Sequence, residues 1–212
     1  MFLTDQGEKM SFFKANSYDI VKIYITQFGI AIFSTMLYLS AGMINADNTV
    51  AWWISLIISI FATGFFFALL YCSAWEWGGK DKIRADGGKL SIDKAKALKM
   101  GLLGNVPNFL FTVIAFIAFL VSSFDETSFI GPIGAVCAMI TRFTASMFQG
   151  IVQNSLDFLH AEVYGKFTFY IFEAVMFFVF SLISVLVIHF GYMMGLKEKR
   201  LFAFMKSDKK YE

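Results

Sequence analysis

Four long stretches of the chain carry almost no charge, and they constrain its fold more than any other feature. They cover residues 23–46, 49–75, 100–124 and 167–194. A helix needs about 20 apolar residues to cross the hydrocarbon core of a bilayer, and each stretch is long enough. Only 16% of the 212 residues are charged, against about 25% in soluble domains. The sequence therefore predicts an all-α integral membrane protein with four spanning helices, forming a single domain over residues 1–212.

Local signals refine these spans. Pro107 should kink the third span, which membrane helices tolerate because neighbouring groups satisfy the freed carbonyl. Gly191 and Gly195, four residues apart at the end of the last span, permit two helices to approach closely. We expect this approach within the chain rather than between two copies. Asn16 or Ser17 is a candidate cap for a helix that enters the first span.

The connecting segments differ strongly in positive charge. They are a lead at 1–22, a loop at 76–99, a segment at 127–166 and a tail at 197–212. Lysine and arginine accumulate on the cytoplasmic side of membrane proteins. Four crossings place 16 of the 18 basic residues on one side, which predicts a cytoplasmic N-terminus, lead, loop and tail. If 129–156 also crossed, the tail would move outside, so five crossings is the alternative.

The segment at 127–166 has a helical pattern of its own. Gly131-Pro132 is a typical helix start, and apolar residues then recur at three- and four-residue steps. The polar residues on the other face are Arg142, Ser146, Gln149, Gln153, Asp157 and His160. We predict an amphipathic or re-entrant helix over 132–160 at the outer face. Its polar stripe faces water, or else a partner or pathway within the membrane.

Glu173 is a charged residue inside the last apolar stretch, and Arg142 is a candidate partner for it. A tight antiparallel hairpin of 132–160 and 167–194 would hold the two about 18 Å apart along the axis. The pair therefore forms only if the segment is re-entrant or tilted. The alternative is that each side chain reaches the interface separately.

The 76–99 loop offers a second candidate contact. Its residues Glu76, Lys80, Asp81 and Arg84 are candidates for contact with a cytoplasmic or membrane partner. Asp86-Gly87-Gly88 predicts a turn, compatible with a small hairpin between Ile83 and Ile92. The basic residues of the loop should also attract anionic lipid headgroups.

The sequence lacks the residue patterns that are typical of metal sites, phosphate-binding loops and nucleic-acid-binding surfaces. Asp157, His160 and Glu162 are metal-ligand types, but a site needs three or four ligands on converging elements. Gly78-Gly79-Lys80 lacks the spacing of a phosphate-binding loop, and aromatic residues do not alternate with basic ones as in nucleic-acid binders. We therefore expect no metal or other cofactor and no nucleic-acid partner. An enzyme that acts on lipid, with Asp157 and His160 as its candidate residues, is the least favoured of the possible functions.

Three segments carry a resemblance to known proteins. They are residues 71–84, the run Asn105-Val106-Pro107 and the closing run Gly191–Leu196. Together they resemble small, uncharacterised multi-span membrane proteins of low-GC Gram-positive bacteria, and the excess of lysine is compatible with such a source. The resemblance implies a bacterial plasma membrane and implies no particular activity.

Two functions fit these features. The first is a non-catalytic accessory or assembly subunit of a bacterial membrane complex, bound to another membrane protein or to a second copy of this chain. The polar stripe of 132–160 or the segment 76–84 would form the contact. The alternative is a small transporter or channel with a polar pathway lined by the 132–160 helix.

Overall fold

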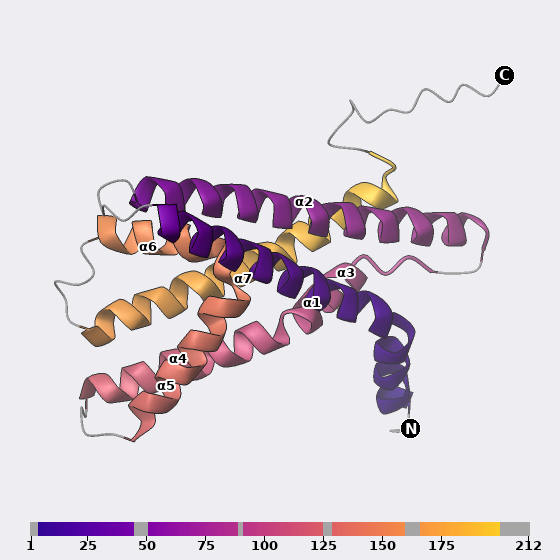
Figure 1. Ribbon diagram of the computed structural model, residues 1–212. Coiled ribbons are helices and arrows are strands. Elements are labelled where there is room, and N and C mark those ends of the chain that lie inside the picture. Colours follow the sequence, from indigo (N-terminus) through magenta and orange to yellow (C-terminus); the bar gives the residue numbers. More distant parts are fainter. Residues whose placement is uncertain (1–3, 45–50, 89–90, 125–128, 160–165, 200–212) are drawn as a thin grey trace.

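The computed structural model describes residues 4–44, 51–88, 91–124, 129–159 and 166–199, which form a bundle of helices (Figure 1). The elements are α1 (Thr4–Ile44), α2 (Ala51–Asp86), α3 (Lys96–Gly104), α4 (Val106–Phe124), α5 (Ile130–Thr144), the short 3-10 helix η1 (Ser146–Phe148), α6 (Gln149–Phe158) and α7 (Lys166–Leu196). None of these ranges contains a strand. The predicted all-α fold is confirmed.

Four helices are long and apolar enough to cross a membrane, as predicted. They cover Phe12–Ser40, Trp53–Asp86, Val106–Phe124 and Thr168–Leu196. The first two extend beyond the apolar stretches, so much of the lead and the first part of the 76–99 loop are helical. Asn16 is consequently no N-cap. Its amide nitrogen donates instead to the carbonyl of Phe12, one turn earlier and 2.9 Å away.

The expected hairpin between Ile83 and Ile92 is wrong, because Ile83 lies within α2. The helix continues this far because its Trp77 and Asp81 are buried against the rest of the bundle. A turn then follows α2, and Gly88 adopts a φ of 69°. This left-handed conformation costs glycine little, which explains the turn after the helix.

The third span is interrupted at Asn105, where α3 ends and α4 begins. The Asn105 side chain donates to the carbonyl of Gly101 at 2.9 Å. Pro107 follows as the second residue of α4 and has no N–H to donate. The prediction that the proline disturbs this span is confirmed, as a break between two helices.

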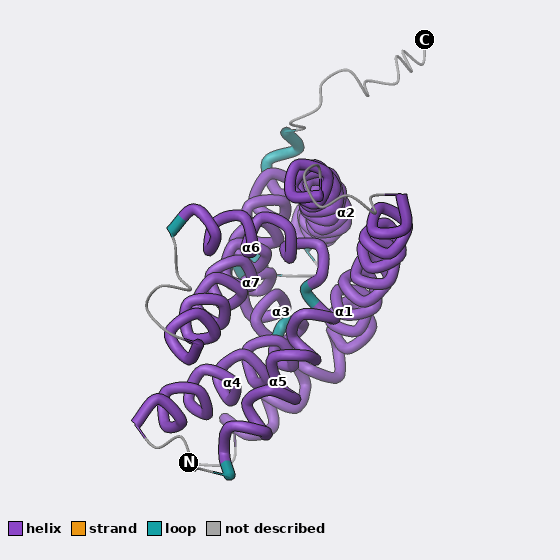
Figure 2. Tube along the Cα trace, turned by 60° about the vertical axis from the view of Figure 1, so that its left-hand side comes forward, coloured by secondary structure: helices purple, strands orange, loops and turns teal. Residues whose placement is uncertain are grey.

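Helices α2 and α7 pack most closely, and glycines make this approach possible. A methyl group on Gly78 of α2 would collide with the backbone of Tyr192. One on Gly191 or Gly195 of α7 would collide with the backbone of α2. The expectation that Gly191 and Gly195 serve packing within the chain is confirmed. Figure 2 shows α7 between α2 and the pair of α4 and α5.

The segment after α4 is bent, with an angle of 81° between α5 and the helix pair η1–α6. Helix α5 runs antiparallel to α4, since Gly131 approaches Ser122 and Gly134 approaches Ala118. Helix α6 runs back along α2, because Gly150 approaches Ser55. The start of α5 and the end of α6 therefore lie at the same end of the bundle, the end at which α7 begins (Figure 1).

We call this bent arrangement the re-entrant segment, because its two arms meet inside the bundle. The predicted four apolar helices plus one further segment are confirmed, and the bent pair counted as one span would give the alternative of five. The expected continuous helix over 132–160 is wrong. The helix ends at Thr144, and Ala145 leaves helical geometry with φ −115° and ψ 25°.

Candidate functional site

The tip of the re-entrant segment is held by two hydroxyl groups of α2 and by a backbone carbonyl of α1. Ser59 and Thr63 of α2 both donate to the carbonyl oxygen of Met147, at 2.6 and 2.9 Å. Ser146 donates to the carbonyl of Ala31 in α1 at 2.7 Å. Backbone groups within a membrane need a partner inside the protein. These hydroxyls take the place of the helical hydrogen bonds lost at the break.

The first turn of α6 is seated against the same two helices. The N–H of Gly150 donates to the Tyr38 hydroxyl at 2.9 Å, and the N–H of Ile151 donates to Ser59 at 3.2 Å. Any side chain at Gly150 would collide with the Ser55 carbonyl and the Tyr38 hydroxyl. The tip is therefore held in one position by groups of α1 and α2, and we call this position its seat.

Arg142, near the end of α5, forms an ion pair with Glu173 of α7. Its Nε donates to Oε1 at 2.7 Å and its Nη2 to Oε2 at 2.6 Å, the two-pronged geometry of a strong guanidinium–carboxylate pair. The guanidinium also lies 5.6 Å from the centre of the Tyr170 ring. The Glu173 side chain is 3% exposed and that of Arg142 is 36% exposed.

This pair settles the two interpretations of Arg142 and Glu173. Separate contacts of each side chain with the interface are excluded, because each side chain binds the other. A straight hairpin would have kept them apart, whereas the bend at Ala145 brings the end of α5 against α7. The condition for pairing, a re-entrant segment, is met.

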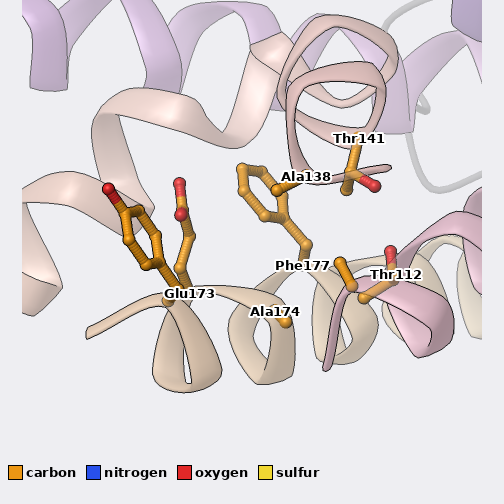
Figure 3. A pocket seen from close by; sticks show the side chains of 8 residues that line it. Thr112, Ala138, Thr141, Glu173, Ala174 and Phe177 are labelled. Carbon is orange, nitrogen blue, oxygen red and sulfur yellow. The ribbon is translucent and has the colours of Figure 1, made fainter. Parts of the chain in front are cut away.

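A small cavity of about 10 Å³ lies beside Glu173, where α4, α5 and α7 meet (Figure 3). It is lined by Thr112, Ala115, Ala138, Thr141, Tyr170, Glu173, Ala174 and Phe177. This volume suits about one water molecule. Among the described residues, Thr112 Oγ1 is buried here without a hydrogen-bond partner, and one turn away both amide atoms of Asn108 are buried without one. Sequence reasoning missed both residues, because amides and hydroxyls are common in membrane helices.

The predicted polar stripe is divided by the break and does not form one face. Ser146 is buried in the tip, and Gln149 is partly buried with no partner for its Oε1 in the part of the chain that the structure describes. Gln153 and Asp157 are exposed in the C-terminal half of α6. His160 lies outside the described residues. The predicted residues do not share one helical face, because their spacing would bring them together only on an unbroken helix.

A second buried ion pair lies at the opposite end of the bundle. Asp81 of α2, 3% exposed, accepts hydrogen bonds from Lys96 at 2.7 Å and from the Tyr192 hydroxyl at 2.9 Å. Asp81 is therefore unavailable to a partner, contrary to expectation, whereas Glu76, Lys80 and Arg84 are exposed. The sequence did not indicate that Asp81 is buried, because residues 76–99 were predicted to form a loop. As a helix, this region places Asp81 about one turn from Gly78, on the face toward α7.

Within the described ranges, no three histidine, cysteine or acidic side chains are grouped closely enough to hold a metal ion. Comparison of the chain with models of protein families, with characterised proteins and with solved structures gave no significant match. The resemblance to membrane proteins of Gram-positive bacteria therefore remains an expectation.

Proposed function

We propose that this chain is a small membrane transporter or channel, and that the α5–η1–α6 segment forms part of its pathway. The observation that carries the proposal is a helix that enters the bundle, breaks inside it beside a buried ion pair, and returns to the same end. Interrupted helices build substrate sites in many transporters, because their free backbone groups and helix ends are available to a ligand. Charged side chains within a membrane are costly and usually serve a function.

The accessory role has less support from the same geometry. It requires a free contact surface, for which the polar stripe of 132–160 and the segment 76–84 are the two candidates. The guanidinium of Arg142 is bound to Glu173, and Ser146 is buried beneath α1. Within the described part of the stripe, Gln153 and Asp157 keep exposed side chains, and Glu76, Lys80 and Arg84 of the other predicted contact are exposed as well. A partner that binds the guanidinium of Arg142 would have to break the ion pair with Glu173 first.

The described conformation corresponds to a closed state of the proposed pathway. The cavity beside Glu173 has a volume of only about 10 Å³, so a solute cannot pass without movement of the helices. The break at Ala145 would allow α5 to change its angle to α6. The ion pair of Arg142 and Glu173 holds α5 against α7 and so prevents this movement. Separation of this pair would free α5 to move while the α2–α7 contact stays in place.

Flux measurements on the purified chain in lipid vesicles test the proposal. Vesicles with the wild-type chain should pass monovalent cations, anions or small metabolites faster than empty vesicles. Glu173→Gln should reduce this flux, since it removes the buried charge with little change in size. Glu76→Gln makes the same exchange at an exposed position of α2 and should leave the flux unchanged. Absence of flux for every solute, together with a partner that co-purifies in fixed ratio, would favour the accessory role.

We further propose a bacterial plasma membrane as the location, with the N-terminus in the cytoplasm. Exposed basic residues at the α2–α3 end, including Lys80, Arg84 and Lys94, support this orientation by the distribution rule for lysine and arginine. They would also lie where anionic headgroups attract positive charge. A reporter fused after Lys199 that is active only in the cytoplasm should be active, and an inactive reporter in a stably inserted chain would reverse the orientation.

A further inference from the structure

The described helices pack around two separate hydrophobic cores. The larger core takes its residues from α1, α2, α3, the tip, α6 and α7, and none of its described members lies between residues 106 and 144. The smaller core consists of Ala115 and Phe119 of α4 and Cys137 of α5, with Tyr170 of α7 packed against it. A unit that has its own core can open separately from the rest of a protein. Helices α4 and α5 form such a unit, and they lie together on one side of α7 (Figure 2).

A break in helical structure bounds this unit at each end. Asn105, directly before α4, has φ −99° and ψ 2°, and Pro107 has no N–H to continue the hydrogen bonds of α3. Ala145, directly after α5, has φ −115° and ψ 25°. Both breaks are anchored to the larger unit, since Ser184 of α7 donates to the Asn105 side chain at 3.3 Å and Ser146 donates to α1. Hinges are a few residues at the ends of elements that absorb a change in φ and ψ, and both breaks have these properties.

The contact between α4 and α5 is close, whereas the contact between α4 and α7 is incompletely packed. A methyl group on Gly134 of α5 would lie only 2.7 Å from the Ala118 Cβ of α4. Between α4 and α7, an apolar groove of about 220 Å³ is lined by Thr112, Val113, Phe116, Ala174, Val175 and Phe178. Thr112 and Ala174 also line the small cavity described above. Protein interiors contain few voids of this size, so α4 should separate from α7 more easily than from α5.

The face of α4 toward α7 also carries two buried side chains without hydrogen bonds. Asn108 is 1% exposed and Thr112, one turn later, is 2% exposed. Neither amide atom of Asn108 has a partner within the described ranges, and neither does Thr112 Oγ1. An unpaired buried polar atom is costly, and lipid supplies no water to relieve the cost. Water that enters between α4 and α7 would satisfy both side chains. In the described conformation, the Phe177 ring stands between the Thr112 hydroxyl and the Glu173 carboxylate (Figure 3), so no continuous polar path exists there.

We infer that α4 and α5 move as one body about the two breaks, and that this movement opens a water-filled passage between α4 and α7 lined by Asn108 and Thr112. The ion pair of Arg142 and Glu173 keeps the passage closed, because it joins α5 to α7. Helix α7 stays with α2, against which its glycines pack. The inference rests on the proposed transport function and names the residues that line its pathway. The experiments below measure the movement without any flux, so that the two proposals fail separately.

Labelling of a single cysteine by a membrane-impermeant methanethiosulfonate tests the passage. The full-length chain carries Cys72→Ser and Cys137→Ala, which remove both native cysteines, and is studied in lipid nanodiscs, where the reagent reaches both faces. Thr112→Cys should react slowly in this chain, because the position is buried. Addition of Arg142→Gln should accelerate the reaction at least about tenfold, the change that loss of about 1.4 kcal/mol from the closed state produces.

Ser122→Cys is the matched control for general loosening of the chain. Ser122 is another buried hydroxyl of α4 without a partner in the described part of the chain, but it lies against Gly131 of α5. It should therefore stay protected when the unit moves as one body, with or without Arg142→Gln. If Arg142→Gln fails to fold, Arg142→Lys replaces it. Its ammonium cannot form the two-pronged contact, so the labelling of Thr112→Cys should increase by a smaller factor.

Distances between spin labels, measured by pulsed electron paramagnetic resonance, test the movement itself. Ile117 of α4, Met139 of α5, Val179 of α7 and Ile57 of α2 are exposed, so labels there disturb the packing little. The distance from Ile117 to Val179 should gain a longer population in the Arg142→Gln chain. The distances from Ile117 to Met139 and from Ile57 to Val179 should stay unchanged, because each joins two helices of the same body.

Three results would overturn the inference. They are equal labelling of Thr112→Cys with and without Arg142→Gln, acceleration of Ser122→Cys by the same factor, and a distance between α4 and α5 that changes together with the distance between α4 and α7. Accelerated labelling of Thr112→Cys alone, in a chain that shows no flux, would keep the movement and refute the transport function. Flux through a chain in which Thr112→Cys stays protected would keep the transport function and refute this passage.

Discussion

Replacing Arg142 and Glu173 by leucine, singly and together, measures what their ion pair contributes to the fold. The two partners differ in exposure, with 36% of the Arg142 side chain accessible and only 3% of the Glu173 side chain. Arg142→Leu therefore leaves a buried carboxylate with no partner. Glu173→Leu leaves a guanidinium that can turn toward the nearer membrane interface on its flexible stem. The two single substitutions should differ in cost.

The structure sets the size of each effect. Two unit charges about 4 Å apart attract each other by about 4 kcal/mol at an effective dielectric constant of 20. Loss of one partner from a buried pair costs about 3–5 kcal/mol, and this range should apply to Arg142→Leu. For Glu173→Leu we expect about 1–2 kcal/mol, because Arg142 regains solvent. The double variant should lie within about 1 kcal/mol of wild type, since apolar replacement of a whole buried pair is often neutral.

Unfolding of the four proteins in the same detergent or lipid mixture, followed by circular dichroism, gives the complete double-mutant cycle. The expected coupling energy is about 3 kcal/mol or more in favour of the pair. Equal costs for the two single variants would contradict the assigned difference in burial. Additive costs in the double variant would show that the pair does not hold α5 against α7, and the argument for a closed state would fail with it.

Three further predictions concern other parts of the fold. Gly195→Leu should destabilise the chain by about 1–3 kcal/mol or more in thermal unfolding, because its side chain would overlap the backbone of α2. Thr63→Val alone should cost about 1 kcal/mol. Together with Ser59→Ala it should cost more than the two single changes added, because the carbonyl at the tip then loses both donors. The hydrogen bond from Lys99 lowers the pKa of the Asp93 carboxyl, so Asp93 stabilises the fold above the pKa it has when unfolded. This stability is lost as the pH falls below about 4. Asp93→Asn should remove that loss from the pH profile of unfolding, by less than about 1 kcal/mol for so exposed a pair.

The spans follow from sequence because they depend on local composition. A stretch of about 20 apolar residues has few alternatives to a membrane helix, and Pro107 disturbs its helix by its own covalent structure. The glycines at 191 and 195 likewise act through the absence of a side chain. Each of these features is decided within one helix or at one contact.

The break at Ala145 could not be predicted in this way. No proline or glycine lies between Thr144 and Phe148, and the tip depends on hydroxyls of Ser59 and Thr63, more than 80 residues away along the chain. The charged residues of the site were found because charge is rare in apolar stretches. Their pairing depended on the bend, and the unsatisfied Thr112 had no signal in the sequence at all.

The hydroxyl seat of the re-entrant tip also has a consequence for biogenesis. Helices α1 and α2, which supply the seat, precede the α5–η1–α6 segment along the chain. They are thus synthesised and can be inserted before the segment leaves the ribosome. Until it reaches them, the Met147 carbonyl has no partner within its own segment, so the tip is unstable in lipid by itself. Membrane insertion of the segment should therefore depend on the first hairpin, and a chain made without residues 1–88 should leave it at the membrane surface.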